Sequence, residues 1–410
     1  MKQKLKLFIR PNDVLFFRDG RPFDAGGDYT GRLAFPPTPV TFYGAIRAAI
    51  LGQKASNFSQ FKTIRWPKEF DSIGLERKKR TLCISDFGLA LARKGATKIE
   101  RIYPIPLDVA KKKDDKAYLI LSPHTASASP ITLNFPIFEL RKLHNLNAVD
   151  SKGNPDILET PVGFLTESGM KKYLNNKAPT SSRDIIPTHD IFQVEPRVGI
   201  RRDNISNTAE TGYIYTLEFA RLGHAWREYQ IGFVIEINTT LLETDAANVR
   251  LLRLGGEARS AAYQADVDWV NPDEPTIGTK FKLILLTPAI FNNDWLPDFI
   301  DPDSLCGSLD NGKINVKLVS AAVGKYVGIG GWDIRKGRAK PVRRAVPAGS
   351  VYFFQSVDDT PFDSQRLIEN AYLKSIHEHS NLSEDSNLIE QGLGLTISGS
   401  VWNSGDTMRR

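Results

Sequence analysis

Alternating apolar and polar residues predict that most of this chain forms β-strands. Between residues 3 and 10, lysines alternate with Leu5, Leu7 and Ile9, which is the two-residue period of a strand with one buried face. The same kind of pattern, or a short apolar run, predicts further strands over 14–17, 81–92, 98–107, 191–201, 213–222, 229–238, 249–254, 280–287, 316–323, 351–354 and 393–400.

Helical periodicity is confined to a few places. Phe42, Ala45 and Ile46 share one helical face, so we expect a helix that Thr38 or Thr41 caps and that ends near residue 51. Two further helices are predicted, over 169–174 and 364–378. Strands and helices do not alternate regularly, which argues against a parallel dinucleotide-binding sheet and favours an α+β fold.

A polar link at 202–212 joins the strand-like runs 191–201 and 213–222, which predicts a long hairpin with a mobile tip. A chain of 410 residues suggests two or three domains, and we place the boundary beside this hairpin. The predicted domains are 1–222, with a hairpin thumb at about 186–222, and 223–410.

Composition predicts an ordinary cytoplasmic protein. Hydrophobic residues make up 41%, and no apolar run reaches the length of about 18 residues that a membrane helix needs. The alternating N-terminus lacks the continuous apolar run of a signal peptide. Cys83 and Cys306, the two cysteines, form neither a disulfide framework nor a metal-binding pair in the sequence.

Net charge is +7, from 54 basic and 47 acidic residues, so the placement of the arginines matters more than their excess. The first basic loop carries Arg18, Arg21 and Arg32 among glycines that let backbone amides approach a ligand. The planar guanidinium suits phosphate, because it donates two hydrogen bonds at once. The neighbouring aspartates leave an internal network of ion pairs equally open.

Two further candidate sites join arginine with glycine. Arg197, Arg201 and Arg202 precede the hairpin tip, where a basic mobile hairpin would suit contact with RNA or a neighbouring subunit. The other site is in the segment 252–259, where its residues are Arg253, Gly255, Gly256 and Arg259. The alternatives are a solvated hairpin edge for the former and a β-turn with an Arg–Glu pair for the latter.

The strongest charge cluster spans 335–344, where six of ten residues are basic and none is acidic. It follows a glycine-rich turn that includes Trp332, whose ring could stack on a base. Each phosphate that such a run neutralises releases counterions and so adds affinity for any nucleic acid. The alternatives are a solvated loop and a core tryptophan. The candidate residues here are Trp332, Lys336, Arg338, Lys340, Arg343 and Arg344.

Catalytic chemistry has little support in the sequence. None of the six histidines forms a metal-ligand pattern, and no nucleophile motif occurs, so we predict no catalytic residue, metal or cofactor. A metal-independent ribonuclease stays open, because it needs only a positioned acid and base. His189, Tyr29 and Tyr43 would be its candidates.

Several segments resemble the CRISPR-associated RAMP superfamily and, within it, the subunit-three family of the type III-B (Cmr) effector complex. They extend over most of the chain, and 54–80 and 108–185 carry little of the resemblance. The segments are FRDGRPF at 17–23, PPTPVTFYGAIRAAIL at 36–51, EPRVGIRRD at 195–203, LRLGGEAR at 252–259, GGWD at 330–333 and VRRAVPAGSVY at 342–352.

This resemblance implies two ferredoxin-like (RRM-like) modules, glycine-rich loops and a protruding β-hairpin. It further implies a non-catalytic subunit that binds the 5′ handle of CRISPR RNA and caps a complex for antiviral RNA targeting. The implied protein partners are the large polymerase-type subunit and a backbone RAMP subunit, while target cleavage belongs to another subunit. A ribonuclease that processes the precursor RNA, and an assembly subunit that contacts only proteins, are the competing hypotheses.

Overall fold

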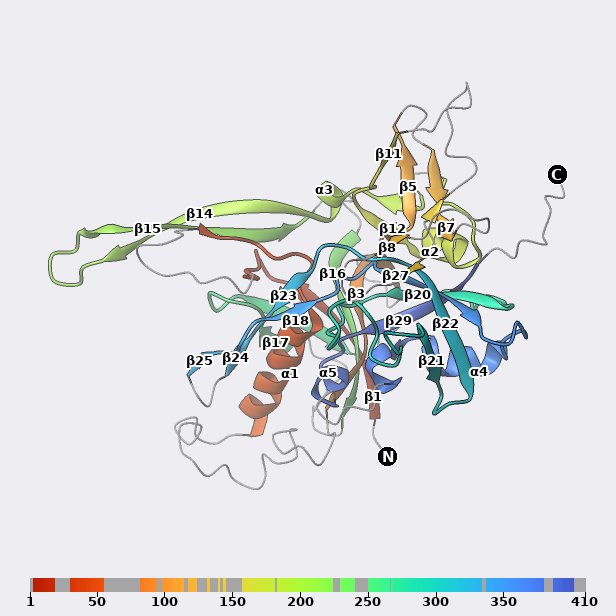
Figure 1. The fold of residues 1–410 in the computed structure, drawn as a ribbon. Helices are drawn as coiled ribbons and strands as arrows, with labels where there is room; N and C mark the ends of the chain where they lie inside the picture. The colour runs from red at the N-terminus through yellow and green to blue at the C-terminus, as the bar shows by residue number, and fades with distance from the viewer. Residues whose placement is uncertain are drawn as a thin grey trace.

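The fold is a sheet-rich α+β architecture, which confirms the predicted class (Figure 1). No helix in the described part of the chain is both long and apolar enough to cross a membrane. The computed structural model describes residues 3–18, 30–54, 82–93, 98–113, 117–123, 131–132, 139–140, 143–144, 157–180, 183–223, 229–239, 250–265, 267–333, 337–379 and 386–401.

The first sheet has nine strands and runs in the order β13-β12-β4-β3-β16-β1-β18-β17, with β19 beside β4. The N-terminal strand β1 lies in its interior, where it pairs antiparallel with both β16 and β18. The strands are β1 (Gln3–Pro11), β3 (Cys83–Arg93), β4 (Lys98–Pro104), β12 (Phe164–Thr166), β13 (Ile185–Ile186), β16 (Tyr229–Thr239), β17 (Arg250–Arg253), β18 (Ser260–Ala265) and β19 (Asp268–Trp269).

The second sheet has six strands in the order β21-β22-β27-β20-β29-β28. Its central strand β20 pairs antiparallel with β27 and β29. The strands are β20 (Lys280–Leu285), β21 (Cys306–Leu309), β22 (Ile314–Ala322), β27 (Val351–Ser356), β28 (Lys374–Ser375) and β29 (Leu395–Ser400).

The two sheets share a four-strand pattern. Four strands of each sheet, numbered in chain order, lie across the sheet in the order second, third, first, fourth. This order is β3-β16-β1-β18 in the first sheet and β22-β27-β20-β29 in the second, and all neighbours are antiparallel. Helix α1 (Pro39–Lys54) follows the first strand of one set, and α4 (Ser364–Ala371) precedes the last strand of the other.

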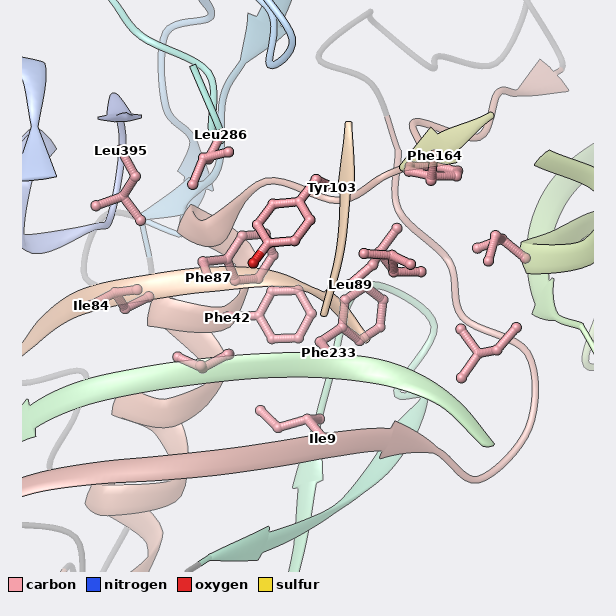
Figure 2. Close-up of a cluster of buried hydrophobic side chains, with 14 of the residues drawn as sticks. Ile9, Phe42, Ile84, Phe87, Leu89, Tyr103, Phe164, Phe233, Leu286 and Leu395 are labelled. Atoms are coloured by element: carbon pink, nitrogen blue, oxygen red, sulfur yellow. The ribbon is translucent and has the colours of Figure 1, made fainter. Parts of the chain in front are cut away.

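The main core lies where the two sheets and α1 meet (Figure 2). Phe42 of α1 lies 5.0 Å from Phe87 and 4.8 Å from Phe233 between ring centroids. Leu286 and Leu395 come from the second sheet's side and join the same cluster. Each fully buried side chain of this size contributes about 1.5–3 kcal/mol, so this shared core joins the two sheets firmly.

Shorter elements surround the sheets. Thr166 caps α2, because its hydroxyl oxygen accepts a hydrogen bond from the Gly169 amide at 3.1 Å. These elements are α2 (Glu167–Leu174), α3 (Thr188–Ile191), the 3₁₀ helix η3 (Ile376–His379), α5 (Ser386–Glu390), β5 (Val109–Lys112), β6 (Tyr118–Ile120), β7 (Ser122–Pro123), β8 (Ile131–Thr132), β9 (Glu139–Leu140), β10 (Leu143–His144) and β11 (Leu158–Glu159).

Two ribbons project beyond the sheets on the same side of Figure 1. The first is the predicted hairpin, formed by β14 (Phe192–Arg202) and β15 (Ala209–Leu222), with β2 (Thr30–Gly31) parallel to β15. The second, which we call the basic ribbon, spans 327–345. It consists of β23 (Val327–Ile329), β24 (Trp332–Asp333), β25 (Arg338–Ala339) and β26 (Arg343–Ala345).

Two sequence predictions need correction. The helix expected at 364–378 ends at Ala371, because Leu373 takes a φ of +52° and donates its amide to the carbonyl of Thr396. The strand expected at 14–17 is a single bridge from Leu15 to Ala220.

Candidate nucleic-acid interface

The base of the hairpin holds a network of ion pairs. Arg197 lies 2.6 Å from Glu195 and 3.6 Å from Asp13, and Arg221 lies 2.5 Å from Glu195 and 3.4 Å from Asp13. Arg259 reaches Asp13 at 3.7 Å from the segment between β17 and β18. Two carboxylates therefore hold three arginines from separate parts of the chain.

The ring of Phe219 forms the floor of this network. The guanidinium carbons of Arg197 and Arg259 lie 5.1 Å and 4.7 Å from its centroid, which is within the range of cation–π attraction. Hydrogen bonds from Arg221 and Arg197 lower the pKa of the Glu195 carboxyl. Glu195 therefore stays ionised at neutral pH, and the two predicted binding residues, Arg197 and Arg259, have partners within the protein.

The glycines of 253–259 approach the protein's own backbone. Gly255 has a φ of +77°, and a Cβ there would lie 2.4 Å from the carbonyl oxygen of Phe16. Gly256 donates its amide to that oxygen at 2.8 Å. These two glycines therefore lie close to the backbone of Phe16, while the side chain of Arg253 is exposed.

The first basic loop closes at the same place. Thr30 and Gly31 of β2 pair with β15, and a Cβ at Gly31 would lie 2.6 Å from Leu217. Arg18 and Arg32 flank this contact and are exposed, while Arg21 lies outside the described residues. Three of the four predicted basic sites therefore meet near the hairpin base.

The hairpin tip carries the remaining two arginines of the second site. Arg201 pairs with Glu210 at 3.2 Å across the hairpin, and Arg202 is exposed beside it. A register shift between Ile200 and Arg202 marks the point where the strands leave regular pairing.

The basic ribbon lies apart from this group. Ile329 and Ala345 are buried and join a small cluster with Leu388 and Leu393, which anchors the ribbon beside α5. Farther out, Lys340 donates its amide to the carbonyl of Gly331 at 2.9 Å and keeps the two chains paired. The ribbon therefore has a fixed base and an exposed outer part.

That outer part is basic and aromatic. The side chain of Trp332 is 62% exposed, so the core-tryptophan alternative is wrong. Tyr326, which immediately precedes the ribbon at its base, is 55% exposed, and the Arg344 guanidinium lies 4.9 Å from the centre of its ring. Lys336 lies outside the described residues. The other predicted cations of this ribbon are all exposed, namely Arg338, Lys340, Arg343 and Arg344.

The candidates for ribonuclease chemistry are in unlike surroundings. Tyr43 is buried on α1, and burial raises its pKa to about 12. His189 is exposed on α3 and lies 3.5 Å from Asp190, and Tyr29 lies outside the described residues. A tyrosine closed off in the core cannot reach an RNA strand, so Tyr43 is removed from the candidate acid–base set.

Comparison with known families tests the resemblance that the sequence segments carry. The family described as CRISPR-associated protein (Cas_Cmr3) matches residues 7–398. This chain belongs to the Cmr3 family. Membership confirms the resemblance that the segments at 17–23, 252–259 and 330–352 carried, and the match includes both sheets and both projecting ribbons of this Cmr3-family chain.

Solved structures show distant likeness to this Cmr3-family protein. A chain of "Cryo-EM structure of the Type III-B Cmr-beta bound to cognate target RNA" is 17% identical, with a TM-score of 0.44, over 85% of this chain and 86% of that one. A chain of "Type III-B Cmr-beta Cryo-EM structure of the Apo state" is 13% identical, with a TM-score of 0.27, over 65% of this chain and 98% of that one. No curated protein matches the sequence.

Proposed function

We propose that this protein is an RNA-binding subunit of a type III-B Cmr effector complex that binds the 5′ handle of CRISPR RNA. The observation that carries the proposal is the basic ribbon, where Trp332 and four described cations stand exposed on two paired strands. Membership of the Cmr3 family supports it. The large polymerase-type subunit and a backbone RAMP subunit are the proposed protein partners.

Each part of the ribbon has a proposed role. The exposed cations bind phosphates, and each contact to a single strand contributes about 0.7 to the slope of log affinity against log salt. The indole of Trp332 stacks on a base, which is worth about 1–3 kcal/mol. The ribbon thus supplies affinity for a single strand with little demand on its sequence.

In this proposal, the hairpin base holds the RNA-binding surface in place. Arg197 and Arg259 are held by Asp13 and Glu195, so they brace the protein more than they bind phosphate. The exposed arginines near that network are proposed to meet the RNA backbone. They are Arg18, Arg32, Arg202 and Arg253.

We also propose two ferredoxin-like modules. The four-strand order that the two sheets share is that of a β-α-β-β-α-β unit, with one helix of the unit described in each. Strands β16, β17 and β18 belong to the first sheet although they follow residue 222. We therefore place the division between modules at 270–279, and the hairpin at 186–222 remains a thumb on the first.

The role is proposed to be non-catalytic and cytoplasmic. Tyr43 is buried, so the acid–base set of a metal-independent ribonuclease is incomplete among the described residues. Incubation of the full chain with precursor RNA and a chelator tests this point. Cleavage at one fixed position would make the protein a ribonuclease.

Binding of a handle RNA across a salt series tests the main proposal. The variant Arg338→Ala/Arg343→Ala/Arg344→Ala should weaken binding roughly 50-fold near physiological salt and lower the salt slope by about 2, because three phosphate contacts are lost. Lys313→Ala/Lys317→Ala/Lys374→Ala removes the same charge from exposed sites on or beside the second sheet and is the matched control. Equal losses in both variants, or equal affinity for handle and unrelated RNA in the assembled complex, would contradict the proposal.

A further inference from the structure

The base of the basic ribbon is built into a buried apolar cluster. Ile329 of β23 and Ala345 of β26 belong to it, and alternate residues of a strand share a face. Arg344, the residue before Ala345, therefore points away from the cluster. Packing at the base thus decides which way this charged side chain is turned. We call the group the anchor cluster, and its members are Val40, Ile290, Ile329, Ala345, Leu388 and Leu393.

Main-chain hydrogen bonds hold the same end of the ribbon. Strand β26 continues to Val346, whose amide donates to the carbonyl of Ala289 at 2.7 Å and whose carbonyl accepts from the amide of Ala289 at 3.0 Å. Two residues earlier, the buried hydroxyl of Thr287 donates to the carbonyl of Gly392 at 2.8 Å. The segment 287–290 therefore joins the ribbon to the loop that follows α5.

That loop is seated on the first sheet and on α1. Gly392 takes a φ of +72°, and a Cβ there would lie 2.7 Å from Cγ2 of Ile84 in β3 and 3.4 Å from Cβ of Pro39 in α1. A left-handed backbone packed this closely favours glycine. Val40, the next residue of α1, packs on the anchor cluster, and α5 lies beside α1 (Figure 1). The ribbon follows β22 of the second sheet, but its base is fixed against the first.

Helix α1 also supports the other arginine-rich region. It packs against β17, where Leu252 is buried in the main core together with Phe42 of the helix. The segment after β17 carries Arg259, which pairs with Asp13 in the network at the hairpin base. One helix therefore contacts the supports of both the ribbon and the hairpin base.

We propose that Leu388, Leu393 and Val40 are positioning residues for RNA binding. They hold the ribbon so that one strand can contact it and the exposed arginines near the hairpin base at the same time. When the spacing of two surfaces is set in advance, the second contact forms within one complex and less ordering is needed on binding. The inference rests on the proposed RNA binding by the ribbon and adds the part of the fold that makes this binding strong.

Leu388→Ala in the full chain tests this role. If the ribbon is then correctly placed about a tenth of the time, affinity for handle RNA should fall about tenfold. The salt slope should stay the same, because the bound state still makes every phosphate contact. Leu388→Met keeps the volume and should restore most of the affinity. Leu174→Ala is the matched control, since it removes a buried leucine from another short helix, α2, and should leave affinity unchanged. Equal losses for Leu388→Ala and Leu174→Ala would overturn the proposal.

A double-mutant cycle separates positioning from a general loss of stability. In the Arg338→Ala/Arg343→Ala/Arg344→Ala background, Leu388→Ala should lower affinity by no more than about threefold, because most contacts of the ribbon are already lost. A tenfold loss in both backgrounds would overturn the proposal. Val40→Ala is a smaller truncation on α1. It should lower affinity in the same direction with the same salt slope, and it should make hydrogen exchange faster in β23 and β26.

These measurements also distinguish this inference from the proposed function. If the ribbon did not bind RNA, the unaltered protein would bind handle RNA no better than the triple arginine variant. Faster hydrogen exchange in β23 and β26 of Leu388→Ala would still be seen, and the proposed function would be overturned. If the ribbon bound RNA without help from the anchor cluster, the triple arginine variant would bind weakly while Leu388→Ala bound like the unaltered protein. That result would overturn this inference alone.

Discussion

The hairpin and the basic ribbon are both two-stranded projections rich in arginine, but their arginines have different partners. At the hairpin base, Arg197 and Arg259 lie on Phe219 and pair with carboxylates. On the ribbon, Arg343 and Arg344 stand exposed beside an exposed aromatic ring. Under the proposed function, the arginines at the hairpin base therefore brace the protein, and those of the ribbon contact phosphate.

The two projections also differ in how they are held. Phe219 is buried with Val14, Phe16 and Leu217 in a small core of its own. The ribbon is anchored through Ile329 and Ala345, and its outer half is exposed. The difference predicts a rigid hairpin base that fixes geometry and a ribbon that adapts to its ligand.

The largest expected effect is on the hairpin base. Phe219→Ala should cost about 3–5 kcal/mol of local stability, because it removes a buried ring and the floor beneath two arginines. Hydrogen exchange of the β14 amides should become faster, while exchange in β1 and β16 should change little, since the main core is intact. Unchanged exchange in β14 would mean that the ion pairs alone hold the hairpin.

The corresponding change on the ribbon should act on binding and not on folding. Trp332→Ala removes a largely exposed ring, so stability should change by no more than about 0.5 kcal/mol. Affinity for handle RNA should fall by about 1–3 kcal/mol through the lost stacking. Trp332→Phe keeps an aromatic face and should recover part of the affinity, whereas equal losses for both variants would contradict stacking.

Local patterns of the sequence were sufficient for much of the fold. Alternation located β1, β3 and β16 within a few residues, and the polar link located the hairpin. The end of α4 could not be predicted in this way. It depends on Leu373, whose amide bonds to Thr396 in a strand that is distant in sequence. The pairing order of the two sheets is likewise a property of long-range contacts.

The candidate site was likewise predictable from the sequence only in part. Arginine and glycine segments could be found by composition, but their partners could not. Asp13 and Arg221 carried no local signal, and they complete the network because β1 and β18 bring the turn after β1 close to Arg259. Ion pairs between residues that are distant in sequence produce no recognisable spacing in the sequence. Exposed arginines and arginines held by carboxylates therefore cannot be distinguished from the sequence.

The smallest predicted effect is a pH dependence of stability that comes from Glu195 at the hairpin base. Hydrogen bonds from Arg221 and Arg197 lower the pKa of Glu195 in the folded state. A lowered pKa stabilises the fold above the unfolded value of about 4.3, and this contribution is lost as pH falls through the folded value. The melting temperature should therefore fall more steeply with acid, below about pH 4, in the unaltered protein than in Glu195→Gln.

The Glu195→Gln variant should also change the affinity for handle RNA. Glu195→Gln removes one carboxylate from the network, so Arg197 and Arg221 should gain some capacity for phosphate, and handle affinity should rise slightly with a steeper salt slope. Asp358→Asn is the control, because hydrogen bonds from Ser356 and Thr360 lower the pKa of Asp358 to about 2 away from the hairpin. That control should change the acid part of the melting curve and leave RNA binding as it is. A fall in handle affinity for Glu195→Gln alone would show that the braced geometry matters more to RNA binding than the number of available cations.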